Sequence, residues 1–123
     1  MPVNAPDSTS DAAPLAWSEF ERVEMRVGTV LEATPLENAR KPAIRMRIDL
    51  GPELGTRSTS AQITQRYRPE DLVGRQVIAV VNFPPKQIGS FLSQCLVLGA
   101  VPGPGDVVLL APDAQVPPGT RIA

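Results

Sequence analysis

The sequence contains no histidine and a single cysteine, Cys95. Without histidine, the Ser-His-Asp and Cys-His arrangements that activate a nucleophile cannot form within this chain. Zinc sites built from cysteine and histidine are excluded for the same reason. One cysteine cannot form an intramolecular disulfide, which is compatible with a reducing compartment. There is also no Gly-rich phosphate loop, so we expect no catalytic residues, no metal and no cofactor.

Aromatic residues make up only 4% of the chain, and the longest uninterrupted apolar run is five residues. We therefore expect a core of Val, Ile, Leu and Ala, and no membrane insertion, because a membrane span needs about 20 apolar residues. The N-terminus lacks a positive region followed by an apolar stretch, so we expect no signal peptide and a cytoplasmic protein. Fourteen prolines and nine glycines favour short elements and an all-β architecture.

Negative charge is concentrated at the N-terminus. Residues 1–21 carry four acids and no base, whereas the remaining 102 residues carry all twelve Lys and Arg with nine acids, a net charge of +3. A mildly basic body permits nucleic-acid binding, although solubility alone would explain such a balance.

The first fifteen residues are rich in Pro, Ala, Ser, Thr and Asp, which predicts a disordered acidic tail before a single domain over residues 16–123. Ser18 and Glu21 have the spacing of a capping box, so we expect a short helix over Ser18–Arg22. Trp17 precedes it and packs either on the body of the domain or against a second subunit.

The rest of the chain reads as a series of strands. Period-two alternation predicts a strand over residues 23–32, with Gly28 marking a bulge or bend, and a second strand over 44–50 with a basic outer face. Gly51–Gly55 reads as a turn and residues 56–60 as a third strand. Helices are expected at 61–67, which Ser60 would cap, and after Pro69. Further strands are expected at 76–81, 96–98 and 107–110, with a turn cluster over 99–105. The apolar runs at 77–81 and 96–98 are typical of strands buried on both faces.

This order predicts an OB-fold, a five-stranded Greek-key barrel with a short N-terminal helix, a helix between strands three and four, and extra short strands at the C-terminus. Ligands of this fold bind on the loops between strands one and two and between strands four and five. Here those loops are residues 34–42, with Arg40 and Lys41, and residues 82–93, with Lys86.

The loop over residues 82–93 is too apolar for a simple connection, because it holds Phe83, Ile88, Phe91 and Leu92. Loops of this length without structure of their own are uncommon and often functional. Each of these side chains could instead close one end of the barrel.

Three segments resemble a known family: RVEMRVGTV, SAQITQRYRPEDLVGRQVIAVVNFPPKQIGSFLSQCLVLGA and PGPGDVVLL. They are similar to the tRNA-binding domain family, over roughly residues 20–122. The SAQIT and NFPP segments are closer to one member type, the CsaA secretion-related chaperones. The resemblance implies an OB-fold, a homodimer, and binding of tRNA or of unfolded and export-destined polypeptides.

Two sets of site residues follow. From the family's tRNA-facing loop and the basic residues nearby, we expect RNA-binding residues at Arg40, Lys41, Asn82, Lys86, Ser93, Gln94 and Cys95. For a polypeptide-binding surface, we expect Phe83, Pro85, Ile88, Phe91 and Leu92. Gln87 and Leu92 stand where relatives have basic residues, which lowers the charge of the loop. The first hypothesis is therefore a CsaA-like chaperone for protein export, and the alternative is a free-standing tRNA-binding protein.

Overall fold

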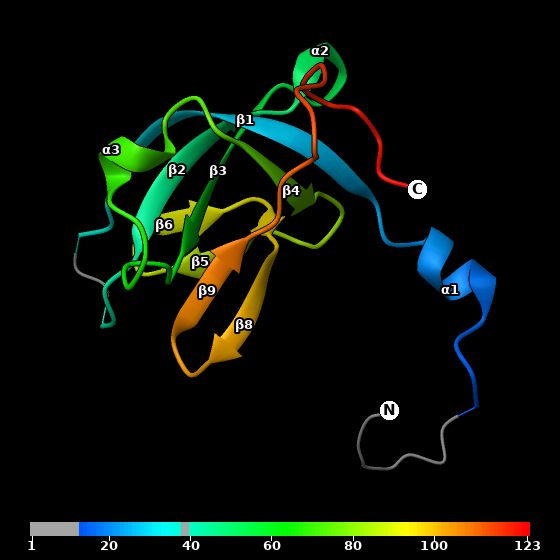
Figure 1. Cartoon of the computed structure of the whole chain (residues 1–123), viewed down its shortest axis with the longest axis horizontal. Coiled ribbons are helices and arrows are strands. Elements are labelled where there is room, and N and C mark those ends of the chain that lie inside the picture. The colour runs from blue at the N-terminus through cyan, green and yellow to red at the C-terminus, as the bar shows by residue number, and fades with distance from the viewer. Residues whose placement is uncertain (1–12, 38–39) are drawn as a thin grey trace.

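The computed structural model describes residues 13–37 and 40–123. Five strands form one antiparallel sheet in the order β3-β2-β1-β4-β7, which curls into a nearly closed barrel (Figure 1). Their bounds are β1 Met25–Pro35, β2 Ile44–Asp49, β3 Thr56–Ala61, β4 Gln76–Val80 and β7 Leu96–Val97. The barrel is OB-like, which confirms the predicted all-β fold class.

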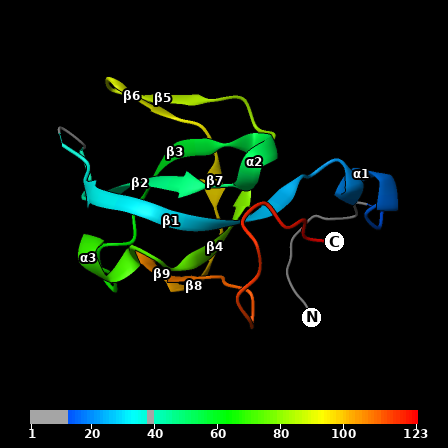
Figure 2. The same ribbon diagram turned by 90° about the horizontal axis from the view of Figure 1, so that it is seen from above.

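Shorter elements surround the barrel. They are the helices α1 Trp17–Glu21, α2 Gly51–Leu54 and α3 Pro69–Leu72, the hairpin of β5 Lys86–Ile88 with β6 Phe91–Ser93, and the hairpin of β8 Gly99–Gly103 with β9 Asp106–Leu109. Figure 2 shows the β5–β6 hairpin standing off one side of the barrel and α1 extending away from it. The expected helix between strands three and four is present as α3, and the expected extra strands are β8 and β9.

The long strand β1 organises the sheet. Its first half pairs with β4, and its second half pairs with β2 from Thr29 onward. Opposite β4, the first half is bordered by the C-terminal segment, because Val27 N donates to Thr120 O (2.8 Å) and Ile122 N donates to Met25 O (2.9 Å). The end of the chain therefore takes the place that β2 leaves free.

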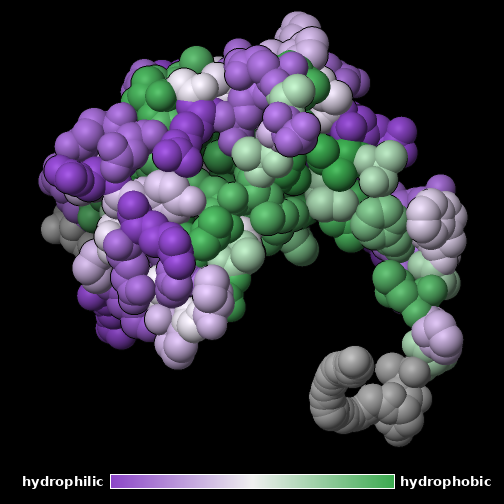
Figure 3. All heavy atoms as spheres, viewed as in Figure 1, coloured by the Kyte–Doolittle hydropathy of each residue, from purple (hydrophilic) through white to green (hydrophobic). Residues whose placement is uncertain are grey.

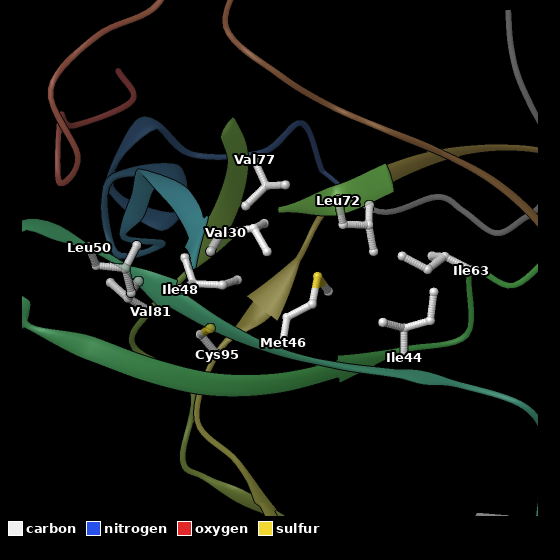
Figure 4. Close-up of a cluster of buried hydrophobic side chains, with 11 residues drawn as sticks. Val30, Ile44, Met46, Ile48, Leu50, Ile63, Leu72, Val77, Val81 and Cys95 are labelled. Atoms are coloured by element: carbon white, nitrogen blue, oxygen red, sulfur yellow. The ribbon is translucent and has the colours of Figure 1, made fainter. Parts of the chain in front are cut away.

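Among the described residues, the core contains no fully buried aromatic side chain, as the composition predicts. It is formed by Val30, Ile44, Met46, Ile48, Leu50, Ile63, Leu72, Val77, Ala79, Val81 and Cys95 (Figure 4). Every residue of β4 is buried, which confirms that this strand is covered on both faces. For residues 96–98 the same expectation is wrong, because Leu96 is 48% exposed at the edge of the sheet.

Gly28, where a bulge or bend is expected, has a packing role, and the bulge does not fall on it. The register of β1 against β2 shifts between Val30 and Glu32, so the irregularity lies beyond the glycine. A Cβ atom at Gly28 would clash with the side chains of Ile48 and Leu50. Glycine is needed here because two core side chains press against the backbone.

Helix starts differ from the prediction. α1 begins at Trp17, and its cap is formed by Glu19, whose Oε1 accepts from Ala16 N (2.9 Å), and not by the Ser18–Glu21 pair. Gly51–Leu54, expected as a turn, forms one helical turn. The expected helix over residues 61–67 is wrong: β3 continues through Ala61, and only a turn follows, closed by Tyr67 N donating to Ile63 O (3.2 Å). A single helical turn is not self-sustaining, and burial of Ile63 draws the chain into the core instead.

Two segments expected as loops contain strands. Within the segment 82–93, residues 86–93 fold into the β5–β6 hairpin, with Ile88 opposite Phe91 and Gly89 at φ +59° in the turn. Residues 99–105 contain β8, which pairs with β9. Both strand pairs are too short for a periodicity to be visible in the sequence.

The expected disordered tail falls almost wholly on residues 1–12, which lie outside the described residues. Within the described chain, none of the helices has the length and apolar character that a membrane span requires.

Candidate functional site: a groove along the open seam of the barrel

A groove of about 1580 Å³ runs along the seam between β3 and β7. Four parts of the chain line it: the β1–β2 connection, the end of β3 with the residues that follow, the β5–β6 hairpin, and the β7–β9 region. Both predicted ligand-binding loops therefore border one hollow. In the sheet order β3 and β7 are the two edges, so the groove lies where the barrel is not closed by a strand ladder.

Basic side chains border the groove, and together they are called its rim. Arg40 and Lys41 come from the β1–β2 connection, Arg45 from β2 and Lys86 from β5, whereas Glu37 is the single acid among the lining residues. All four cations are exposed. Within the described part of the chain, none of them forms an ion pair. The rim therefore presents uncompensated positive charge to an anionic ligand.

The interior of the groove is apolar. Its buried and half-buried lining includes Ile63, Cys95, Val97, Val107 and Leu109. The hairpin adds two large side chains above them, Ile88 and Phe91, both half-buried. Apolar surface in a hollow bordered by charge is typical of a site that binds an extended, mixed-polarity ligand.

Polar contacts hold the β8–β9 wall of the groove in place. The guanidinium of Arg66 forms a two-point ion pair with Asp106, with Nη2 donating to Oδ2 (3.0 Å). The hydrogen bond from Arg66 lowers the pKa of Asp106. Tyr67 adds a second contact, because its hydroxyl accepts from Leu109 N (3.0 Å). The turn after β3 thus fixes the opposite wall.

Comparison with known proteins shows which family this barrel belongs to. Residues 25–121 match the model of a family described as a tRNA binding domain. The chain belongs to the tRNA-binding domain family.

Solved structures and curated relatives agree with this family. The chaperone CsaA of Bacillus anthracis is 53% identical, covers 90% of this chain and 100% of its own, and superposes with a TM-score of 0.86. The CsaA chaperone of Picrophilus torridus is 43% identical, with coverage of 89% and 100% and a TM-score of 0.83. Methionine–tRNA ligase of Porphyromonas gingivalis is 37% identical over 111 residues, which are 90% of this chain and 16% of the ligase. The chain thus spans about a sixth of the length of such ligases, and a tRNA-binding domain is a non-catalytic module.

Of the residues proposed for RNA binding, five line the groove: Arg40, Lys41, Lys86, Ser93 and Cys95. Asn82 lies outside it and ties two segments together, because its Oδ1 accepts from Glu24 N (3.0 Å) and its Nδ2 donates to Arg22 O (2.6 Å). Gln94 also lies outside the groove, and its Oε1 accepts from Ser58 N (2.9 Å). Both amides are already occupied by the protein backbone.

Ser93 and Cys95 belong to the closed end of the seam. Thr59 Oγ1 donates to Cys95 O (2.7 Å) and lies 3.2 Å from Ser93 Oγ. Burial raises the pKa of the Cys95 thiol from 9.0 to about 11, against the smaller lowering effects of the Thr59 hydrogen bond and the Arg57 charge. The thiol is therefore neutral at physiological pH, which fits a packed side chain and not a nucleophile.

Of the residues proposed for polypeptide binding, Ile88 and Phe91 line the groove, whereas Phe83, Pro85 and Leu92 do not. Side chains alternate across the hairpin, so the Ile88–Phe91 pair faces the groove and the Gln87–Leu92 pair faces away. Phe83 is 56% exposed in the segment before β5.

Sequence reasoning missed the residues of the seam itself. Ser60, Val97 and Val101 line the groove but carry no signal of their own in the sequence. Only the knowledge that β3 and β7 form the two edges of the sheet and lie across the groove from each other could have found them. Among the described residues, no three His, Cys, Asp or Glu side chains gather into a set that could hold a metal ion.

Proposed function

We propose that this chain is a CsaA-like chaperone of the cytoplasm, which binds unfolded or export-destined polypeptides in the seam groove and has no catalytic role. The observation that carries the proposal is the groove, whose apolar interior is bordered by four cations that form no ion pair within residues 13–37 and 40–123. The likeness to chaperones that this chain matches over their full length supports it. An unfolded chain offers the exposed apolar side chains that such an interior would cover.

Protection of a denatured client tests the proposal. A chemically denatured enzyme is diluted into buffer with increasing amounts of the protein, and aggregation is followed by light scattering. We expect the double variant Ile88→Ser, Phe91→Ser to need about tenfold more protein for half protection, because two large apolar contacts are lost. The matched control is Phe83→Ser, Leu92→Ser, which removes two exposed apolar residues that do not line the groove. Equal protection by both variants would show that the groove does not bind the client.

A second candidate function is tRNA binding in the same groove. The family description and the basic rim favour it, since Arg40, Lys41, Arg45 and Lys86 could each neutralise a phosphate. In this reading Phe91 stacks a base against the apolar interior.

Total tRNA, titrated at several salt concentrations, tests this candidate. The double variant Arg40→Gln, Lys86→Gln should flatten the dependence of log affinity on log salt by roughly two phosphate contacts. The control replaces two exposed arginines outside the groove, Arg22→Gln and Arg121→Gln, and should leave that slope unchanged. Affinity independent of salt would exclude this candidate.

We also propose that the protein is a homodimer. α1 buries none of its residues on the barrel, and Leu15 and Trp17 are each 71% exposed. The Trp17 ring lies beside that of Phe20 in the same helix, with ring centroids 5.5 Å apart, and its 71% exposure argues against a staple onto the barrel. Apolar surface gathers where the barrel faces α1 (Figure 3). A second copy lying against this surface would cover both.

A further inference from the structure

The seam between β3 and β7 is closed at one end and open at the other. At the closed end, Gln94 N donates to Ser58 O (2.8 Å) and Thr59 Oγ1 donates to Cys95 O (2.7 Å). Beyond this point no ladder joins the two strands in the described residues, since β3 and β7 are the edges of the sheet. Ser60 of β3 and Val97 of β7 line the groove in this open part.

Alternation along each strand fixes where the backbone groups point. Ser58 directs its N–H and C=O toward Gln94, away from β2, and Ser60, two residues further, has the same orientation. On the other wall, Leu98 N donates to Ile78 O in β4, so its neighbour Val97 faces away from β4. In residues 13–37 and 40–123, the outward N–H and C=O of Ser60 and Val97 have no backbone partner.

The β3 edge is the better receptor for an added strand. Along the β7 side, the free position is bordered by Cys95, whose carbonyl is bonded to Thr59, and by Gly99, which pairs with Leu109 of β9. The β3 edge instead runs on from Ser60 past Ala61 into the groove. Unpaired sheet edges bind extended peptides through main-chain hydrogen bonds, with side-chain pockets giving selectivity.

The lining also determines the chemistry of the occupant. Successive side chains of an added strand point to opposite faces, so one set would meet the apolar interior and the other would be directed outward. Four cations against one acid, Glu37, favour carboxylates in the outward set. The complementary ligand is an extended segment in which apolar and acidic residues alternate.

We propose that the groove binds its polypeptide as an extended strand, added antiparallel to the free edge of β3 at Ser60, with carboxylates toward Arg40, Lys41, Arg45 and Lys86. The inference rests on the proposed polypeptide-binding function and specifies the conformation and charge of the bound segment. One peptide residue opposite Ser60 exchanges two main-chain hydrogen bonds with it.

The first test uses synthetic peptides and fluorescence anisotropy. The probe is a fluorescein-labelled ten-residue peptide of alternating valine and glutamate, and its control alternates valine and lysine. We expect the lysine peptide to bind at least about tenfold more weakly, because its charges meet the cationic rim. In an extended peptide the N–H groups of alternate residues point to the same side, so only one of the two alternate sets of amides faces β3. N-methylation of three central amides of that set should weaken peptide binding about tenfold, whereas N-methylation of three amides of the other set should change the affinity little. Equal losses from both sets would overturn the strand mode.

The second test changes the protein. Ser60→Pro removes the seam-facing N–H, whereas Ser60→Ala keeps it, so only the proline variant should lose peptide affinity. Amide exchange in the wild-type protein gives an independent readout that needs no variant. Exchange of the Ser60 amide should slow on adding the valine–glutamate peptide, whereas that of Ala61, which faces β2, should stay unchanged. Unchanged exchange at Ser60 with bound peptide would overturn the inference.

If the groove binds its ligand in another way, or binds another ligand, these experiments give different results. If denatured clients are protected and peptides bind without the Ser60 and methylation effects, the strand mode fails and the proposed function stands. If neither clients nor peptides bind and total tRNA does, both fail. If exchange at Ser60 slows with protein concentration alone, a second copy fills the seam, which also overturns the inference.

Discussion

At the scale of single residues, two polar side chains that the sequence predicts to bind a ligand are hydrogen-bonded to the protein backbone instead. Asn82 bonds Arg22 and Glu24, which are about 60 positions away, and Gln94 bonds Ser58, which is 36 positions away. No local pattern reveals such partners, because they depend on which strands become neighbours. The predicted cationic residues differ from these amides, because Arg40, Lys41 and Lys86 are exposed and form no ion pair within the described chain.

Cys95 gives a prediction for pH. Its pKa is raised from 9.0 to about 11 by burial, so the unfolded state releases the thiol proton between pH 9 and 11 while the folded state keeps it. The stability contribution is therefore present below pH 9 and is lost as pH rises toward 11, at most about 3 kcal/mol. Urea unfolding at pH 8 and pH 10.5 measures this loss.

A control variant separates the effect of Cys95 from that of other groups at high pH. Cys95→Ala lacks the thiol and should lose less stability between the two pH values than the wild type. The same pH dependence in both proteins would assign the effect to other groups. Slow labelling of native Cys95 by iodoacetamide at pH 8 is expected for the same reason.

At the scale of elements, the β5–β6 hairpin decides which apolar residues face the groove. Its three-residue strands are too short for a periodic pattern, so the sequence indicates an apolar loop without showing which side chains share a face. The Gly-Ser pair between two short apolar runs was the available hairpin signal. The predicted helix over residues 61–67 is wrong for a different reason: a local helix signal is present in the sequence, but burial of Ile63 overrides it.

Gly89 tests the hairpin as an element. Its φ of +59° lies in the left-handed region, and a Cβ at this position would meet no neighbour within 4 Å. Gly89→Val should therefore destabilise the turn of the hairpin locally by about 1–2 kcal/mol, through backbone strain alone. The melting temperature of the barrel should change little, because the hairpin is a separate sheet.

Client protection is the readout for Gly89→Val, and it should fall because Ile88 and Phe91 are no longer held over the groove. Gly89→Asn is the matched control, since asparagine tolerates this conformation better. If both variants protect clients like the wild type, hairpin geometry does not contribute to binding.

At the scale of the whole molecule, the barrel architecture follows from the order of elements, and the structure brings the two expected loops to one groove. The seam could not be predicted, since it depends on how closely the two sheet edges β3 and β7 approach each other, and these strands are 35 residues apart at Ala61 and Leu96. The N-terminal helix is likewise visible in the sequence, but its projection away from the barrel is not (Figure 1).

The dimer is the prediction for the whole molecule. Sedimentation at micromolar concentration should give twice the mass of one chain, and Trp17→Ser should shift the protein toward the monomer, because an exposed aromatic anchor is lost. Val73→Ser, which removes another exposed apolar residue on the barrel, is the control and should leave the mass unchanged. A wild-type monomer at this concentration would contradict the proposal.

Mapping an unfolded client onto the protein by amide chemical shifts tests the central claim most directly. The client is a reduced, carboxymethylated protein that cannot refold, added to the isotope-labelled chain. We predict the largest shifts at groove residues such as Ser60, Ile88, Phe91 and Val97. Shifts confined to α1 or to Leu31 and Val73, with the groove unchanged, would contradict the account.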